Sequence, residues 1–236
     1  MTKPQTQAPL AAATPLVPAS RRRGRPPKTQ TDPDEGNRRR PLIEAAARLF
    51  RTKGFDATST RDIAAAAGMR SGSPFYHFES KNALLYVVVQ EGMAFAAQSQ
   101  RDALARLPEG ASPREQLRNL VRQHFEVLHG PHADFIPVML YEWRSLTSAQ
   151  RGDIAAIKDA YEACWTPVLA ALHRQGALKA DPATARLFIL GALNWTVQWF
   201  NPRGALSLDE LTEQALDLFL GSPSPECHLD GADGAL

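Results

Sequence analysis

The sequence predicts an all-helical protein, and three observations carry that prediction. From Arg38 onward apolar residues recur with the period of an α-helix. Helix-capping residues and glycines divide this pattern into about nine segments. Short β-branched clusters such as Val87–Val89 lie inside longer helical periods, so no strand is expected. The 236 residues are enough for one large domain or two small ones.

Capping signals place the elements in order. Ser59 and Asp62 resemble a capping box, and Ser112–Glu115 is a second one with Pro113 at the first helical position. Glycines follow the first, second and last helices. Pro167 is expected to bend a long helix. The expected helices cover residues 38–53, 60–67, 71–78, 81–107, 113–129, 134–146, 148–176, 182–200 and 208–220.

Composition excludes several classes of protein. The chain is 44% hydrophobic and 22% charged, which is typical of a soluble globular protein. No apolar run reaches the roughly 18 residues that a membrane-spanning helix needs. Cys164 and Cys227 are the only cysteines, too few for a disulfide scaffold or a cysteine-rich zinc site. We expect a cytoplasmic bacterial protein with no targeting segment and no membrane partner.

The formal net charge of +2 conceals an uneven distribution. Residues 1–40 contain nine basic and three acidic side chains, whereas residues 91–236 contain twelve basic and eighteen acidic ones. The first 37 residues also contain seven prolines and no aromatic residue, which is typical of a disordered segment. A basic amino-terminal arm attached to an acidic remainder indicates a protein that faces nucleic acid at one end.

A compact motif lies between Thr58 and Phe78, with the sequence TSTRDIAAAAGMRSGSPFYHF. A short helix is followed by a tight turn at Gly68 and then by a second short helix with small polar and aromatic side chains. Gly68 supplies the backbone freedom that such a turn demands. This order is typical of a helix-turn-helix, whose second helix lies in the DNA major groove.

The span Arg39–Leu85 resembles the DNA-binding domain of the TetR family of bacterial transcriptional regulators. The matching run is AAARLFRTKGFDATSTRDIAAAAGMRSGSPFYHFESKNALL, about forty residues in family order and spacing. Pro74 departs from the family, whose members commonly have a non-proline residue there, so the base preference is expected to be this chain's own. The resemblance implies a disordered arm (1–37), a three-helix DNA-binding domain (38–85), a larger helical ligand-binding and dimerisation domain (86–221) and a flexible tail (222–236).

The matched positions imply roles in DNA binding. Polar side chains on the turn and the early recognition helix can reach base edges or phosphates. His77 matches a family tyrosine that meets phosphate, and Lys81 lies at a helix start, where phosphates bind. Ser59 could equally be a helix cap, and Arg51 is assigned to the solvated face of the first helix. The expected DNA-contacting residues are Thr58, Ser59, Arg70, Ser71, Ser73, Tyr76, His77 and Lys81.

The amino-terminal arm contains the run RRRGRPPK at Arg21–Lys28. Its centre, Arg23-Gly24-Arg25-Pro26, resembles the core of an AT-hook, in which two arginines enter a narrow minor groove. A generic basic tail that only attracts phosphates remains the alternative.

The family resemblance also implies a dimer interface and an effector pocket in the larger domain. Both sets of residues could instead be ordinary core, and the sequence leaves that open. The expected interface residues are Leu187, Leu190, Gly191, Trp195, Leu211, Ala215 and Leu218. The expected pocket residues are Gln123, His124, Phe125, Met139, Glu142, Trp143, Tyr161, Trp165 and Asn194.

The function expected from these features is a ligand-responsive repressor that binds a palindromic operator as a homodimer. The stretches YEWRSL and LGALNWT loosely resemble regulators of fatty-acid and sterol catabolism, which implies a small hydrophobic effector such as an acyl-CoA. No metal-ligand, nucleotide-binding or nucleophile motif is present, so neither catalysis nor a cofactor is expected. The alternatives are an architectural protein for AT-rich DNA and a transcriptional activator of the same family.

Overall fold

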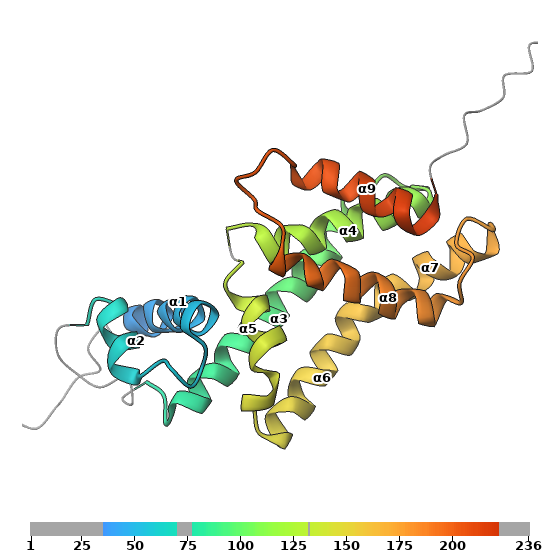
Figure 1. The fold of residues 1–236 in the computed structure, drawn as a ribbon. Coiled ribbons are helices and arrows are strands. Elements are labelled where there is room, and N and C mark those ends of the chain that lie inside the picture. Colours follow the sequence, from blue (N-terminus) through green and yellow to red (C-terminus); the bar gives the residue numbers. More distant parts are fainter. Residues whose placement is uncertain (1–34, 70–76, 132, 222–236) are drawn as a thin grey trace, which may run out of the picture. The chain divides into compact units, whose positions relative to one another are not determined.

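The structure is a computed structural model that describes residues 35–69, 77–131 and 133–221. All regular structure in these ranges is helical, which confirms the predicted fold class (Figure 1). None of these helices combines the length and the apolar character that crossing a membrane requires. The elements are α1 (Glu35–Lys53), α2 (Thr60–Ala66), α3 (Lys81–Ala105), α4 (Pro113–His129), α5 (Phe135–Glu142), η2 (Trp143–Ser145), α6 (Ser148–Ala163), α7 (Trp165–Arg174), α8 (Pro182–Trp195), η3 (Thr196–Gln198) and α9 (Leu208–Leu220).

The predicted helix starts are confirmed at their caps. Ser59, Ser112 and Ser207 each form a complete capping box. In each box the carboxylate of the third helical residue accepts a hydrogen bond from the backbone N–H of the capping serine. In the first box the Ser59 N–H and hydroxyl lower the pKa of Asp62. The second helix of the expected helix-turn-helix, 71–78, begins in the range that the structure does not describe.

The single helix expected over 148–176 is two helices in the structure. Helix α6 ends at Ala163 and α7 begins at Trp165. A proline ring clashes with the carbonyl four residues earlier, which for Pro167 is that of Ala163. The chain therefore breaks before the proline, and Pro167 occupies the first turn of α7, where its missing N–H removes no intrahelical hydrogen bond.

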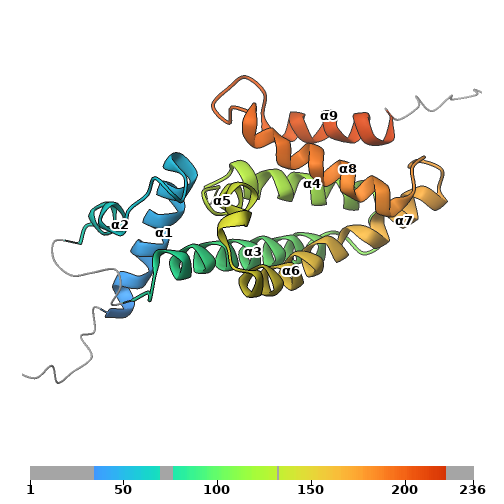
Figure 2. The same cartoon turned by 60° about the horizontal axis from the view of Figure 1, so that its bottom comes forward.

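Helix α3 is the central element, and it packs against α1, α4, α5 and α6. Its residues Leu84, Leu85, Val88 and Val89 are fully buried. Figure 2 shows α3 running from the end near α1 toward the helices of the larger domain. The domain boundary expected after residue 85 therefore falls inside one continuous helix, which joins the two parts of the chain.

Helices α4 and α9 are antiparallel neighbours joined by three ion pairs. Arg114, Arg118 and Arg122 follow one another at a spacing of four residues, so they share one face of α4. Their partners on α9 are Asp217, Glu213 and Asp209, at 3.1, 2.7 and 2.5 Å. Exposed pairs of this kind contribute little individually, so most of the stability of the contact comes from the apolar packing beneath them.

Candidate functional site

The loop between α1 and α2 organises the DNA-binding part of the chain. The Thr58 side chain is 1% exposed, and its hydroxyl donates to the Gly54 carbonyl at 2.7 Å. Thr58 thus holds the loop together, and its hydroxyl does not face solvent. Ser59 is exposed and caps α2, which is the structural role that the sequence left open for it.

Lys81 begins α3 and is anchored to the same loop. Its Nζ donates to the carbonyls of Phe55 and Thr58 at 2.7 and 2.9 Å, and it lies 4.2 Å from the centre of the Phe55 ring. The ammonium group therefore fixes the start of α3 against the α1–α2 loop. A phosphate contact by Lys81 stays a prediction, and it would have to share these donors.

The recognition segment lies largely outside the described residues. His77, at its end, is half-buried, and Phe78 is buried in the core. Arg39 stacks over the Phe78 ring at 5.6 Å. The expected DNA contacts Arg70, Ser71, Ser73 and Tyr76, and the arm residues Arg23 and Arg25, are among the residues that the structure does not describe.

Helix α5 is fastened to the DNA-binding part at both ends. At its carboxyl end the Glu142 carboxylate accepts from the Phe55 backbone N–H at 2.8 Å. At its amino end Arg51 donates to Asp134 at 2.9 Å and to the Ala133 carbonyl at 3.1 Å. The sequence placed Glu142 in the pocket and Arg51 on a solvated face. Both instead join the two domains. Their partners lie more than 80 positions away in the sequence, so no local pattern predicts these contacts.

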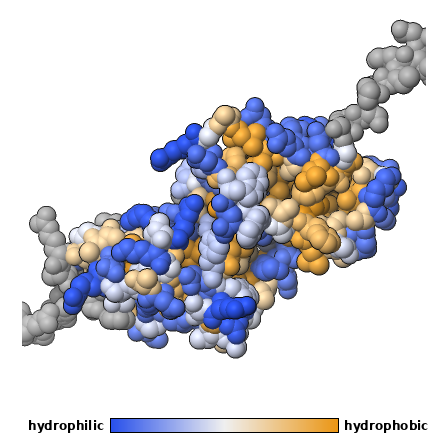
Figure 3. Space-filling view, viewed as in Figure 1, coloured by the Kyte–Doolittle hydropathy of each residue, from blue (hydrophilic) through white to orange (hydrophobic). Residues whose placement is uncertain are grey.

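An apolar face is exposed on α8 and α9. The side chains of Phe188 and Leu218 are 73% and 78% exposed, and Trp195 is 64% exposed. Figure 3 shows hydrophobic residues gathered over these helices. A Cβ added at Gly191 would meet no atom within 4 Å, so this helix face can accept a closely packed neighbour.

The structure divides the expected interface residues into two groups. Leu187, Gly191, Trp195 and Leu218 are exposed on the apolar face, and Ala215 is half-buried. Leu190 and Leu211 point into the core of the chain and are 8% and 5% exposed. The sequence pattern could not separate the two groups, because α8 is apolar on both its inner and its outer face.

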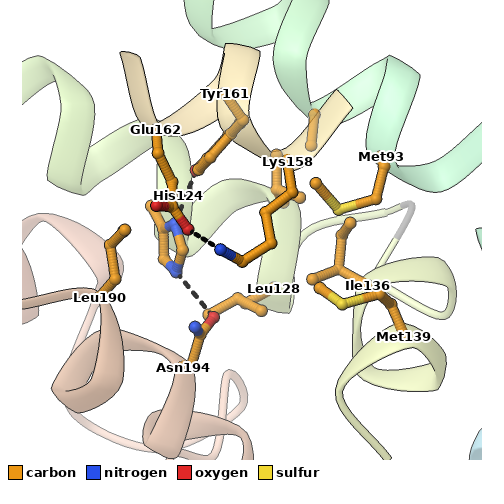
Figure 4. A pocket seen from close by; sticks show the side chains of 12 residues that line it. Met93, His124, Leu128, Ile136, Met139, Lys158, Tyr161, Glu162, Leu190 and Asn194 are labelled. Carbon is orange, nitrogen blue, oxygen red and sulfur yellow. Dashed lines mark hydrogen bonds and ion pairs between the residues drawn. The ribbon is translucent and has the colours of Figure 1, made fainter. Parts of the chain in front are cut away.

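A small cavity, partly open to solvent, lies within the larger domain, among α3, α4, α5, α6 and α8 (Figure 4). Most of its wall is apolar, and the polar side chains are contributed by α4, α6 and α8. The lining residues are Met93, Ala96, His124, Val127, Leu128, Ile136, Met139, Lys158, Tyr161, Glu162, Leu190 and Asn194.

A chain of hydrogen bonds crosses one side of the cavity. His124 lies between Tyr161, 2.6 Å from its Nδ1, and Asn194, 3.2 Å from its Nε2 (Figure 4). Burial lowers the pKa of His124 to about 4, so the ring is neutral at pH 7. Burial likewise raises the pKa of Tyr161. Because Asn194 Oδ1 can only accept, the imidazole donates from Nε2–H, and its Nδ1 accepts a hydrogen bond from the Tyr161 hydroxyl.

The expected pocket residues are only partly brought together. His124, Met139, Tyr161 and Asn194 line the cavity. Phe125 and Trp165 are fully buried in the surrounding core, and Gln123 and Trp143 are partly buried away from the cavity wall. Lys158 and Glu162 also line the cavity but are not predicted from the sequence, because charged residues on a helix normally indicate a solvated face. No group of three metal-ligating side chains occurs within the described ranges.

Two family models match the chain. The model "Bacterial regulatory proteins, tetR family" covers residues 42–87, and "Tetracyclin repressor-like, C-terminal domain" covers residues 110–222. Among curated proteins, the HTH-type transcriptional repressor KstR2 of Rhodococcus jostii (strain RHA1) is 28% identical over 204 residues, which is 85% of this chain and 98% of that protein.

Solved structures agree with these matches. The TetR family transcriptional regulator PfmR from Thermus thermophilus is 30% identical, with a TM-score of 0.67 over 78% of this chain and 99% of that one. AibR in complex with isovaleryl coenzyme A and operator DNA is 26% identical, with a TM-score of 0.70 over 79% of this chain and 100% of that one. A structure described as superantigen PfiT is 38% identical, with a TM-score of 0.64 over 82% of this chain and 100% of that one. The chain belongs to the TetR family of bacterial transcriptional regulators.

Proposed function

We propose that this regulator is a repressor that binds a palindromic operator as a homodimer and is released by a small hydrophobic effector. The observation that carries the proposal is the position of α5. Ile136 and Met139 on this helix line the cavity, while Asp134 and Glu142 at its ends hold the DNA-binding part. A molecule that displaces the cavity wall would therefore act directly on the helix-turn-helix.

The exposed apolar face of α8 and α9 supports the homodimer. Monomeric proteins rarely leave contiguous apolar patches uncovered, and Phe188, Trp195 and Leu218 form such a patch. A twofold interface there would pair the same surface on both copies and set the spacing of two recognition helices. Operators bound by such dimers are palindromic for the same reason.

Acyl-CoA thioesters are the first class of effector to test. AibR, whose fold this chain shares, was crystallised with isovaleryl coenzyme A and operator DNA, and KstR2 is a repressor. The apolar cavity wall is suited to an acyl chain. The proposal assigns the protein no catalytic activity and places it in the bacterial cytoplasm, on the nucleoid.

The basic arm is proposed to add affinity by inserting Arg23 and Arg25 into the minor groove beside the operator. Removal of residues 1–36 is expected to weaken operator binding and to lower its dependence on salt concentration, because fewer phosphate-bound cations are displaced. An unchanged affinity and an unchanged salt dependence would contradict a role for the arm.

The decisive experiment is a footprint on the DNA upstream of the protein's own gene, in the presence of competitor DNA. Protection of a palindromic sequence that is lost on addition of an acyl-CoA supports the proposal. Protection of any A·T-rich sequence would instead indicate an architectural protein. Deletion of the gene is expected to raise transcription from the protected promoter, whereas a fall would identify an activator.

A further inference from the structure

The polar side chains of the cavity differ in what they offer to a ligand. Tyr161 and His124 are hydrogen-bonded to each other, because the Tyr161 hydroxyl donates to the imidazole Nδ1. The Asn194 side-chain oxygen accepts a hydrogen bond from His124. No described residue accepts a hydrogen bond from the Asn194 amide nitrogen. Lys158 extends into the same space from α6 (Figure 4). The groups available to a ligand are therefore hydrogen-bond donors.

The cavity wall contains one cation and one anion, Lys158 and Glu162, and a second cation, Arg186, lies beside the wall. Glu162 is 8% exposed and forms ion pairs with two cations, Lys158 on its own helix and Arg186 on α8, the latter at 3.5 Å. Arg186 alone can compensate the carboxylate, so the three side chains together carry one surplus positive charge. The Lys158 side chain is 45% exposed, so water solvates part of this surplus charge, and the ammonium group is available to an anionic ligand.

The rest of the wall excludes polar ligands. Met93, Ile136 and Met139 face Lys158 across the cavity and offer only apolar surface (Figure 4). An anion that enters must therefore carry an apolar body, and with water displaced its attraction to the ammonium group is stronger than at an open surface.

From this arrangement we propose that the effector is an apolar carboxylic acid, whose carboxylate is bound by the Lys158 ammonium and the Asn194 amide. Its hydrocarbon body lies against Met93, Ile136 and Met139. The inference rests on the proposed function, because it concerns the effector of the same cavity. When the acid binds, Lys158 shifts its charge from Glu162 to the ligand, and Glu162 remains paired with Arg186.

The consequence for regulation lies in α8. Arg186 and Asn194 both belong to this helix, and its opposite face carries the exposed Phe188 and Trp195. A carboxylate between Lys158 and Asn194 thus connects α6 to α8 directly. The head group would act on the α8–α9 face, while the hydrocarbon body acts on α5.

The test measures binding by isothermal titration calorimetry with the full-length protein and no DNA. Octanoate, octanamide and octanoyl-CoA share one hydrocarbon body and differ only in the head group. We expect octanoate to bind about tenfold more tightly than octanamide, because only the carboxylate carries a negative charge and forms an ion pair with Lys158.

Three variants and one control test which side chains cause the preference for octanoate. Lys158→Met is expected to weaken octanoate binding by about fivefold or more and to leave octanamide binding unchanged, whereas Lys158→Arg retains the preference. Lys179→Met, at an exposed lysine in the loop before α8, is the matched control. Glu162→Gln shifts the balance in the opposite direction and is expected to tighten octanoate binding about twofold or more, because it raises the local positive charge.

The outcomes separate this inference from the proposed function. Equal affinities for octanoate and octanamide, or a preference that survives in Lys158→Met, overturn the carboxylate site. If octanoyl-CoA binds and releases DNA while octanoate does not bind, the site is overturned and the proposed function stands. If none of the three molecules binds, the inference and the hydrophobic effector both fail. Circular dichroism of each variant confirms that it is folded.

Discussion

The contact of α5 with the DNA-binding part and the outer face of α8 and α9 use opposite chemistry. The first is polar and satisfied within the chain, as in the hydrogen bond from the Phe55 N–H to Glu142. The second is apolar and uncovered, with Phe188 and Trp195 exposed. Directional polar contacts fix one geometry between two parts of a chain, whereas an uncovered apolar face gains free energy only from another surface. The polar contact of α5 is therefore suited to transmitting a signal within one chain, and the apolar face of α8 and α9 is suited to binding a second chain.

The largest effect is expected from a charge on the apolar face. Phe188→Glu would place two carboxylates in the proposed dimer interface and weaken both dimerisation and operator binding by roughly a hundredfold. Size-exclusion chromatography with light scattering and a gel-shift assay measure the two effects. Ala149→Glu, at an exposed position in α6, is the control and should change neither. A dimer that persists in Phe188→Glu would show that this face is not the interface.

The next effect concerns the buried polar interior. The unfolded chain binds a proton at His124 near pH 6.5, whereas burial lowers the pKa of the folded protein's His124 to about 4. Between these values the unfolded state holds more protons, so stability falls as the pH falls. We expect a loss of about 2 kcal/mol in the free energy of unfolding between pH 6.5 and pH 5.

Urea unfolding at a series of pH values measures this loss. Burial also lowers the pKa of His129 to about 4, so that residue adds a smaller loss of the same sign. In His124→Gln the pH dependence over this range should become shallower, because one of the two groups is gone. A slope equal to that of the wild type would mean that His124 is protonated alike in the folded and unfolded chains.

A moderate effect is expected at the polar contact itself. Glu142→Gln retains the shape of the side chain but removes its charge, which should cost about 1 kcal/mol of stability. More informative is the effector response, because operator affinity should depend less on effector in this variant. Fluorescence anisotropy with and without effector measures the ratio. Glu79→Gln, at an exposed glutamate before α3, is the control, and an unchanged ratio in Glu142→Gln would exclude this transmission route.

The smallest effect is expected from the ion pairs between α4 and α9. Arg118→Ala removes the pair with Glu213, whose side chains are about half exposed, and should lower stability by about 0.5 kcal/mol. The difference from the wild type should shrink in high salt, because exposed charges are screened. Thermal unfolding at two salt concentrations measures it. A loss of several kcal/mol would mean that the ion pairs, and not the apolar packing, hold α9.

Local signals predicted the helices well and their breaks less well. The Ser112 and Ser207 caps, like the end of the last helix at Gly221, depend on residues within one turn of each other, so the sequence contains both partners. A bend at Pro167 within one long helix was expected, whereas the structure has a break before the proline. The steric conflict of a proline acts on the preceding turn, which places the break at Cys164.

The functional site was predicted less completely than the fold. The polar chain of Tyr161, His124 and Asn194 contains residues that the sequence proposed for the pocket, and the structure brings them together. Lys158 and Glu162 were missed, because on the sequence they are ordinary charges of an amphipathic helix. The buried Glu162 also pairs with Arg186 on α8, a contact that the sequence does not indicate.

By itself, the sequence of this protein determined the helical class, most helix starts and the helix-turn-helix motif. Each of these depends on residues three or four positions apart, and that spacing is written in the chain. Only the tertiary structure decided which helix faces are covered, that Glu142 holds Phe55 and that Lys158 and Glu162 enter a cavity. Those contacts join residues on different helices, and packing of the whole chain selects them among many sterically equivalent pairs.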